Sequence, residues 1–223
     1  RNKLYLSVFK TLKLTNPKAF VVENVRGLKT MWDGNVFKEI IKKFESAGYI
    51  VTESLLNSAD YGVPQIRHRV FIVGIKKELN KKFEFPKPEF DKDNYITCGE
   101  AIDNLPSLEN GELKSSNYNE KPTTNFQRYV MDCNKLYNHE ATLHKQFVKE
   151  TIALVPEGGN YKDLPKGVGD SRKFNEAWTR YHSKKPSRTI DTGHRNHFHY
   201  KWNRVPTIRE NARLQSFKDS FEF

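Results

Sequence analysis

Residues 19–25 read Ala-Phe-Val-Val-Glu-Asn-Val, an apolar run that ends in a carboxylate, an amide and a turn. A short apolar run between polar residues predicts a buried strand of a parallel sheet, over residues 19–22. A helix is predicted on each side of it. Residues 4–14 carry apolar side chains at helical spacing before Asn16-Pro17, and residues 36–46 are amphipathic and end near Gly48.

Two further strands are predicted over residues 49–56 and 69–75, joined by a Tyr-Gly-Val-Pro turn. The order strand, helix, strand, strand is typical of the back half of an open α/β sheet. Because the chain opens directly on a helix, we expect the earlier strands of such a sheet on an upstream segment.

The composition changes after Lys76 to a stretch rich in Lys, Pro, Asn and Glu, which predicts a domain boundary. The region that follows has scattered aromatic residues and little periodicity, so we expect a loop-rich lobe. Near the end, Thr207 and Glu210 predict a capping box that opens a helix over residues 207–217. The predicted domains are residues 1–85, a lobe over 86–203, and a helix in 204–223 that returns to the first domain.

The charge balance indicates a polyanionic partner. The chain has 38 Lys and Arg against 27 Asp and Glu, a formal net charge of +11. Nucleic acid is the expected partner, although composition alone leaves a merely basic protein equally open. Two widely spaced cysteines give no disulfide framework, and no apolar run reaches the ~18 residues of a spanning helix. We therefore expect a cytoplasmic protein without a membrane role.

Three ordered blocks resemble the DNA cytosine-5 methyltransferase family. They are residues 17–28 (PKAFVVENVRGL), 57–69 (NSADYGVPQIRHR) and 204–217 (RVPTIRENARLQSF), and residues 154–165 and 185–192 extend the resemblance. The family's variable DNA-recognition region lies between the second and third blocks, here roughly residues 91–200. The resemblance implies an α/β fold: the back half of a Rossmann-like methyltransferase sheet plus a smaller, loop-rich DNA-recognition lobe.

The resemblance also implies a reaction. Members of the family transfer a methyl group from S-adenosyl-L-methionine to carbon 5 of a cytosine in a specific site of double-stranded DNA, and a restriction-modification system is the expected setting. The target base must leave the helix to be reached, so these enzymes flip it out. A thiolate adds to carbon 6 of that base.

Glu23 and Arg69 are the catalytic candidates that the resemblance implies. A carboxyl at ring nitrogen 3 relieves the charge that thiolate addition creates, and Glu23 matches it. Its position at the carboxyl end of a strand supports the assignment independently, because α/β ligand sites lie there. Arg69 matches the arginine that contacts the exocyclic oxygen of the cytosine. A glutamate that caps a turn and a solvated charged strand edge are the alternatives.

The remaining candidates concern DNA. Arg67 alternates with Arg69 along a strand, so both point to one side, and Gln65 joins them in shaping the pocket. Thr189 and Ile190 match the family's Thr-aliphatic pair. The expected DNA-binding residues are Gln65, Arg67, Arg188, Thr189, Ile190, Arg195, Arg204 and Arg209. His194, His197 and His199 suggest zinc, but only Asp191 lies near them as a further ligand, so no metal is expected.

Several family features are absent from the sequence. It has no Pro-Cys-Gln nucleophile loop, no Gly-rich donor turn and no final donor-site block after Phe223, and Cys98 and Cys133 lie in other contexts. We therefore expect no methyl-donor residues here, no activity of the chain alone, and a nucleophile on a missing upstream segment or partner subunit. A non-catalytic DNA-binding module and an unrelated basic α/β RNA-binding protein are the competing hypotheses.

Overall fold

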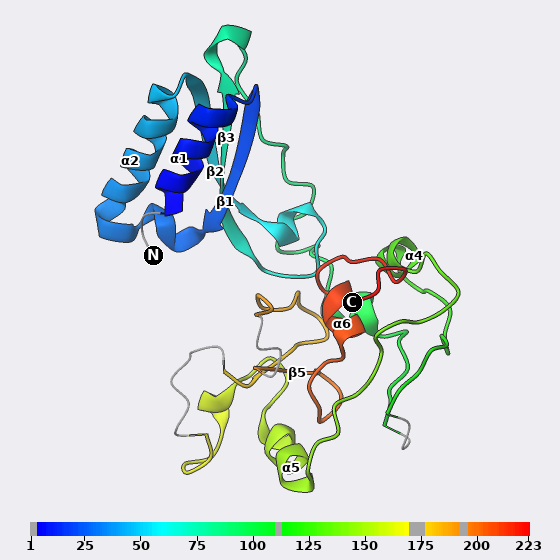
Figure 1. Cartoon of the computed structure of the whole chain (residues 1–223). Coiled ribbons are helices and arrows are strands. Elements are labelled where there is room, and N and C mark those ends of the chain that lie inside the picture. The colour runs from blue at the N-terminus through cyan, green and yellow to red at the C-terminus, as the bar shows by residue number, and fades with distance from the viewer. Residues whose placement is uncertain (1–3, 110–112, 170–176, 192–195) are drawn as a thin grey trace. The chain divides into compact units, whose positions relative to one another are not determined.

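The computed structural model describes residues 4–109, 113–169, 177–191 and 196–223, which form two compact units (Figure 1). Unit 1 comprises Arg1–Asn57 and Arg67–Pro88, and unit 2 comprises Ser58–Ile66 and Glu89–Phe223. The boundary after Pro88 lies close to the predicted one. The division differs from the predicted ranges at two points: the loop Ser58–Ile66 and residues 204–223 both belong to unit 2.

Unit 1 contains a three-stranded sheet of β1 (Ala19–Val25), β2 (Tyr49–Asn57) and β3 (His68–Lys76), in the order β1-β3-β2. All three predicted strands are present. The expectation of a buried parallel strand at residues 19–22 was wrong, because β1 pairs antiparallel with β3, and Val21 is 66% exposed. The physical reason is that β3 runs back along β2 and then lies between β2 and β1, so both neighbours oppose its direction.

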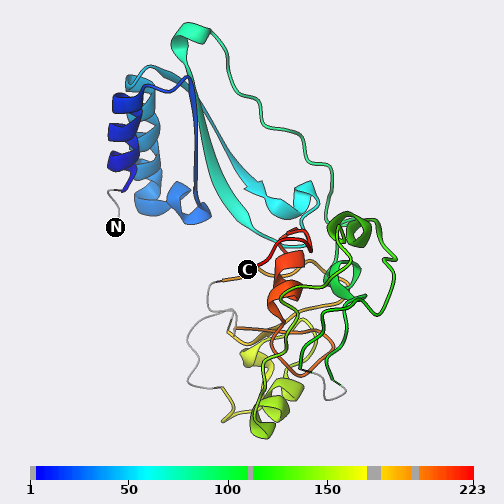
Figure 2. The ribbon, with the colours of Figure 1, turned by 45° about the vertical axis from the view of Figure 1, so that its right-hand side comes forward.

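Two helices, α1 (Leu4–Thr15) and α2 (Asn35–Ser46), cover one face of this sheet (Figure 2). The fully buried rings of Phe44 and Tyr49 each meet the Phe20 ring edge-on, with centroids 5.0 Å apart. Burying one such side chain stabilises the fold by ~1.5–3 kcal/mol. Gly74 permits this packing, since a Cβ there would lie 2.1 Å from the Phe20 ring. Both predicted helices are confirmed.

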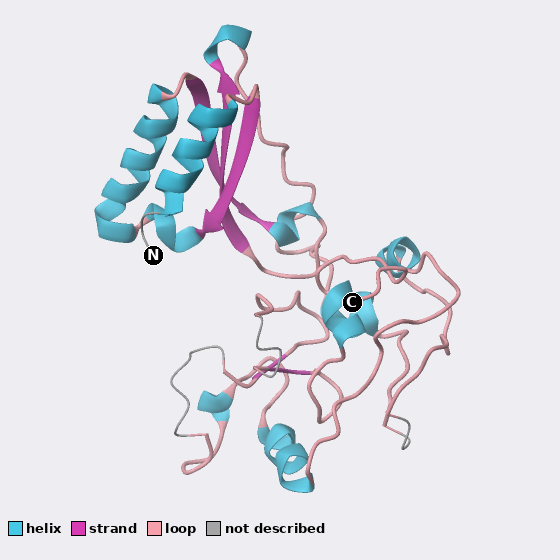
Figure 3. Cartoon of the chain, in the orientation of Figure 1, coloured by secondary structure: helices cyan, strands magenta, loops and turns pink. Residues whose placement is uncertain are grey.

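Unit 2 consists mainly of loops with short helices (Figure 3), as expected for the lobe. Its helices are α3 (Cys98–Ile102), α4 (Asn125–Val130), α5 (Gln146–Leu154) and α6 (Ile208–Arg213), and its strands are β4 (Thr179–Arg180) and β5 (His197–Phe198). The 3-10 turns are η1 (Arg26–Lys29), η2 (Met31–Gly34) and η4 (Lys77–Leu79) in unit 1, and η3 (Ser58–Tyr61) and η5 (Tyr161–Asp163) in unit 2. None of the helices in the described ranges is long and apolar enough to cross a membrane.

The predicted capping box is confirmed at the start of α6. The Thr207 hydroxyl accepts from the Glu210 N–H at 3.1 Å, and the Glu210 carboxylate accepts from the Thr207 N–H at 2.8 Å. The helix ends earlier than predicted, at Arg213.

Arg213 is the main polar anchor of unit 2. Both Arg213 and Asp219 are fully buried, and the guanidinium donates to the carboxylate at 3.0 and 2.6 Å. Arg213 also donates to Asn104 Oδ1 at 2.7 Å, and the Tyr118 hydroxyl donates to Asp219 at 2.7 Å. These bonds join α6 to segments about a hundred residues earlier, which explains why residues 204–223 belong to this unit.

Candidate functional site

Glu23 and Arg69 form an ion pair at one end of the unit 1 sheet. The register pairs Val25 of β1 with Arg69 of β3, which brings the Glu23 and Arg69 side chains together although they are 46 positions apart in the sequence. The Arg69 Nε lies 2.8 Å from Glu23 Oε1, and the two side chains are 19% and 47% exposed. A pair this exposed adds little stability. Its main effect is to orient a carboxylate that remains accessible to a ligand.

Arg67 adds a second positive charge to this cluster. Its backbone N–H donates to Asn57 Oδ1 at 3.1 Å. Burial lowers the pKa of Arg67, the nearby charge of Arg69 lowers it further, and Glu23 opposes both effects. Two guanidiniums and one carboxylate therefore form a cluster with net positive charge, which suits an anionic or carbonyl-rich ligand.

Gln65 lies inside unit 2, in a short parallel bridge with Ser187. The Ile66 N–H donates to Ser187 O at 2.8 Å, and the Ser187 N–H donates to Pro64 O at 3.0 Å. The Gln65 side chain is 1% exposed, and neither of its amide atoms has a hydrogen-bond partner among the described residues. This placement differs from the expected DNA contact and makes Gln65 a support for the loop.

The segment that contains Thr189 is hydrogen-bonded to the same loop, at Gln65 and Ile66. The Thr189 hydroxyl donates to Ile66 O at 2.9 Å, and Ser187 supplies the bridge beside it. Arg188 and Thr189 are exposed, whereas Ile190 packs against the core of unit 2. Ser187 was not predicted from the sequence, in which its only signal was its place inside the matched segment 185–192. Arg195 and His194 lie outside the described residues.

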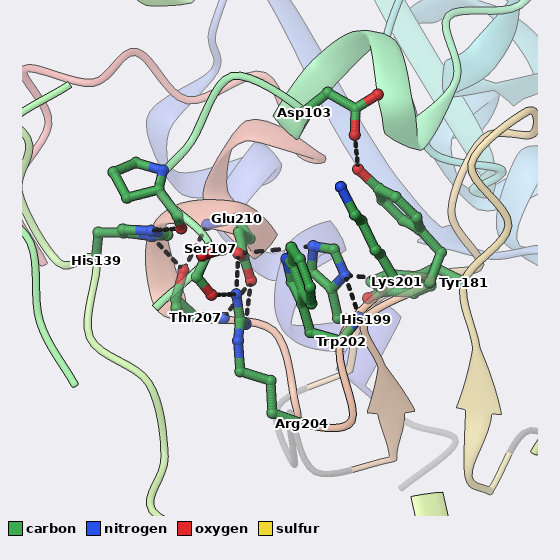
Figure 4. A network of polar contacts seen from close by, with 12 residues as sticks. Asp103, Ser107, His139, Tyr181, His199, Lys201, Trp202, Arg204, Thr207 and Glu210 are labelled. Carbon is green, nitrogen blue, oxygen red and sulfur yellow. Dashed lines mark hydrogen bonds and ion pairs between the residues drawn. The ribbon is translucent and has the colours of Figure 1, made fainter. Parts of the chain in front are cut away.

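Arg204 and Arg209, expected at DNA, are instead buried structural residues (Figure 4 shows Arg204). Arg204 is 3% exposed and holds both oxygens of Glu210, at 2.8 and 2.7 Å. Arg209 is 0% exposed and donates to the carbonyl oxygens of Tyr137, Lys218 and Phe221. Because these donors are engaged inside the unit, neither guanidinium is placed to reach a phosphate.

Two of the histidines that suggested zinc, His197 and His199, are also interior. His197 is 2% exposed and stacks on Tyr181, with ring centroids 5.3 Å apart. His199 Nδ1 accepts from the N–H groups of Lys201 and Trp202 at 3.0 and 3.2 Å. Within the described ranges, no three His, Cys, Asp or Glu side chains gather as a metal site would require.

The buried charges around α6 have shifted pKa values. Burial lowers the pKa of His199 to about 4, although Glu210, 3.7 Å away, opposes this. Burial alone would raise the pKa of Glu210, but the Arg204 guanidinium and then His199 outweigh it and hold that pKa well below the usual range. At neutral pH, His199 is therefore neutral and Glu210 is ionised.

We expect unit 2 to lose stability as the pH falls from about 6.5 to about 4. A histidine titrates near 6.5 in the unfolded chain, and His199 titrates near 4 in the folded one. Because the folded pKa is lower, the unfolded chain binds the proton first, so acid favours unfolding in this window by about 3 kcal/mol in total. Burial also lowers the pKa of His139, which adds to the effect.

Urea unfolding across this pH range checks the prediction. His199→Gln should reduce the pH dependence relative to the unsubstituted chain. An equal slope in His199→Gln and the unsubstituted chain would contradict it.

Neither cysteine has the environment of a nucleophile. Cys98 is fully buried at the start of α3, and burial raises the pKa of its thiol far above the ordinary value. Cys133 is half-buried, and its thiol donates to Lys135 O at 3.0 Å. A reactive cysteine needs an accessible thiolate, so both fit the expectation of ordinary small residues.

The whole chain, residues 1–223, matches the family model described as C-5 cytosine-specific DNA methylase. The chain belongs to this family. It is 38% identical over 227 residues to the type II methyltransferase M1.HphI of Haemophilus parahaemolyticus, covering 100% of this chain and 54% of that protein. It is 33% identical over 234 residues to M.NgoFVII of Neisseria gonorrhoeae, covering 100% and 55%. This C-5 cytosine-specific DNA methylase chain thus spans about half the length of these relatives.

A solved structure supports the fold of this C-5 cytosine-specific DNA methylase chain. It is an E. coli prophage-encoded protein assigned as a DNA modification methyltransferase. The TM-score is 0.75 at 23% identity, over 100% of this chain and 65% of that one. The expected class, a partial methyltransferase α/β fold, is therefore confirmed.

Proposed function

We propose that the chain is the part of a type II DNA cytosine-5 methyltransferase that holds the target cytosine and recognises DNA, in a restriction-modification system. The observation that carries this proposal is the Glu23–Arg69 pair, with Arg67 beside it, at one end of the unit 1 sheet. Family membership and the type II relatives support the reaction class.

In this proposal Glu23 acts at ring nitrogen 3 of a flipped cytosine, where it holds or supplies a proton as negative charge develops on the ring. Arg69 donates to the exocyclic oxygen and orients Glu23 through the 2.8 Å contact. Arg67 adds positive charge beside both. The thiolate that attacks carbon 6 would come from an upstream segment or a partner subunit, so we propose that this chain alone is inactive.

S-adenosyl-L-methionine is the methyl donor that the family implies. The described residues do not fit a donor site. The connection from β1 to α2, the strand-to-helix link of unit 1, consists of two 3-10 turns and offers no Gly-rich turn. We assign no residue of this chain to the donor.

We propose that unit 2 contacts duplex DNA. Exposed Arg188 and Thr189 are its candidate contacts in the described residues, and Ile190 and Gln65 support them from inside. Arg195 completes the proposed set.

The chain is expected to bind duplex DNA with a steep dependence on salt, because Lys and Arg at phosphates should supply most of the affinity. Fluorescence anisotropy of a labelled mixed-sequence duplex, in a series of rising salt, measures the slope. A folded chain that does not bind at low salt would rule out the DNA assignment. To test the alternative of a non-catalytic DNA-binding module, the upstream reading frame should be searched for a Pro-Cys-Gln loop.

A further inference from the structure

Arg180 in β4 places a buried positive charge in unit 2 without a carboxylate partner. Its side chain is 8% exposed, and burial lowers its pKa, with Glu157 only partly offsetting the effect. Its hydrogen-bond acceptors are the carbonyl oxygens of Ile152, Val155, His199, Tyr200 and Lys201 and the side-chain oxygen of Asn203. No carboxylate in the described ranges forms an ion pair with it, so its charge produces a positive potential nearby.

A hollow of about 90 Å³ beside Arg180 is lined by further basic side chains, those of His182, Lys185 and Arg188. This volume equals roughly three water molecules at ~30 Å³ each, which suits a small tetrahedral oxyanion but not a base. The Lys185 ammonium is exposed, and no described residue forms a hydrogen bond or ion pair with it. Gly158 forms part of the wall, and a Cβ there would lie 3.0 Å from the His182 ring.

The loop that carries these side chains, residues 182–188, is fixed by hydrogen bonds to three other segments. The Ser183 carbonyl oxygen accepts from the Gly99 N–H, and the Lys185 carbonyl oxygen accepts from the Cys98 N–H, both at 2.9 Å. The Ser187 N–H donates to Pro64 O at 3.0 Å. The Ser183 N–H donates to the Glu157 carboxylate at 2.6 Å. A loop held in this way loses little conformational entropy when a ligand binds.

Glu157 is an acidic group that contacts this loop. Its carboxylate accepts from the Ser183 N–H and faces His182 Nδ1 at 3.5 Å. The Ser183 hydrogen bond lowers the pKa of Glu157 despite partial burial, so the group is ionised at neutral pH. It does not line the hollow, which therefore keeps its positive character.

We propose that this hollow is an oxyanion site that binds one phosphate of the DNA backbone. In this site the Lys185 ammonium forms an ion pair with the phosphate. The proposal rests on the proposed DNA-binding function. Phosphate contacts of this kind set the position of a protein on the duplex without reading its sequence. The site would anchor DNA beside Thr189. Thr189 and Ser187, two positions earlier, are both hydrogen-bonded to the segment 64–66.

The chain provides a matched pair for the test. Lys184 and Lys185 are both exposed neighbours in one loop, but only Lys185 lines the hollow. Binding of a labelled duplex is measured by anisotropy over a salt series for the full chain, Lys185→Gln, Lys184→Gln and Lys185→Arg. Losing one phosphate contact should reduce the slope of log K against log salt by about 0.9 and weaken binding about fivefold to tenfold near 0.1 M salt.

We expect this loss in Lys185→Gln, a clearly smaller change in Lys184→Gln, and a slope close to that of the unsubstituted chain in Lys185→Arg. Equal effects of the two glutamine variants would overturn the site while leaving DNA binding intact. If the unsubstituted, folded chain does not bind the duplex, the proposed function fails and the phosphate assignment with it. Unchanged thermal unfolding of each variant shows that the fold is preserved.

Discussion

Glu23→Gln should lower the turnover of a reconstituted enzyme by ~100-fold or more, the usual range for one acid or charge-stabilising group. The enzyme would be made by joining this chain to an upstream half that carries a Pro-Cys-Gln loop and the donor site. Glutamine keeps the shape of the side chain and can still meet Arg69, so DNA affinity should remain largely intact. Single-turnover methyl transfer and duplex binding, measured on the same preparation, separate the two effects.

Two further variants make this test specific. Arg69→Ala should harm both binding and turnover, because Arg69 would hold the base before reaction and also orients Glu23 at 2.8 Å. Glu53→Gln is a matched control, since Glu53 in β2 also forms an ion pair, with Lys29 of η1 at 2.7 Å. Normal turnover of Glu23→Gln would show that the Glu-Asn-Val match is only a strand terminus.

Asp219→Ala should lower the free energy of unfolding of unit 2 by about 3–5 kcal/mol, the usual cost of removing one partner of a buried ion pair. The substitution leaves the buried Arg213 guanidinium without its charge partner and removes the acceptor of the Tyr118 hydroxyl. Denaturant unfolding is followed by tryptophan fluorescence in a Trp32→Phe background, which removes the tryptophan signal of unit 1. The remaining signal, from Trp178 and Trp202, then reports on unit 2.

A surface ion pair supplies the control for this prediction. Glu140 lies 3.8 Å from Lys114, and their side chains are 64% and 70% exposed. Glu140→Ala should therefore change stability by less than about 1 kcal/mol. The double variant Arg213→Met/Asp219→Leu should be less destabilised than Asp219→Ala, because it removes the Arg213 charge and leaves only Arg209, 3.8 Å from Asp219, without its carboxylate. Equal stability of Asp219→Ala and the unsubstituted chain would show that the ion pair does not hold the unit together.

Periodicity in the sequence was enough to predict the elements of unit 1. The helices and strands have their predicted places because local apolar spacing governs helix and strand formation. The orientation of β1 was not predictable in this way. Strand pairing depends on which distant segment lies between β1 and β2, and a short apolar run carries no information on its partner's direction.

For the candidate site, the family blocks were enough to nominate Glu23 and Arg69 before their contact was known. The roles of the remaining arginines depended on burial. Arg67 and Arg204 both follow the family pattern, yet one lies beside the catalytic candidates and the other is bound inside unit 2 to Glu210.

The sequence by itself determined the family, the α/β character of unit 1, the capping box of α6 and the identity of the catalytic candidates. Each of these rests on residues close together in the chain or on an ordered pattern of residue types. Only the tertiary structure decided that Arg204 and Arg209 are internal, that Gln65 is buried beside Ser187, and that Arg180 lies next to a basic hollow. The physical reason is that a guanidinium binds carbonyl, carboxylate and phosphate oxygens with the same donors, so its partner depends on which segments folding brings to it.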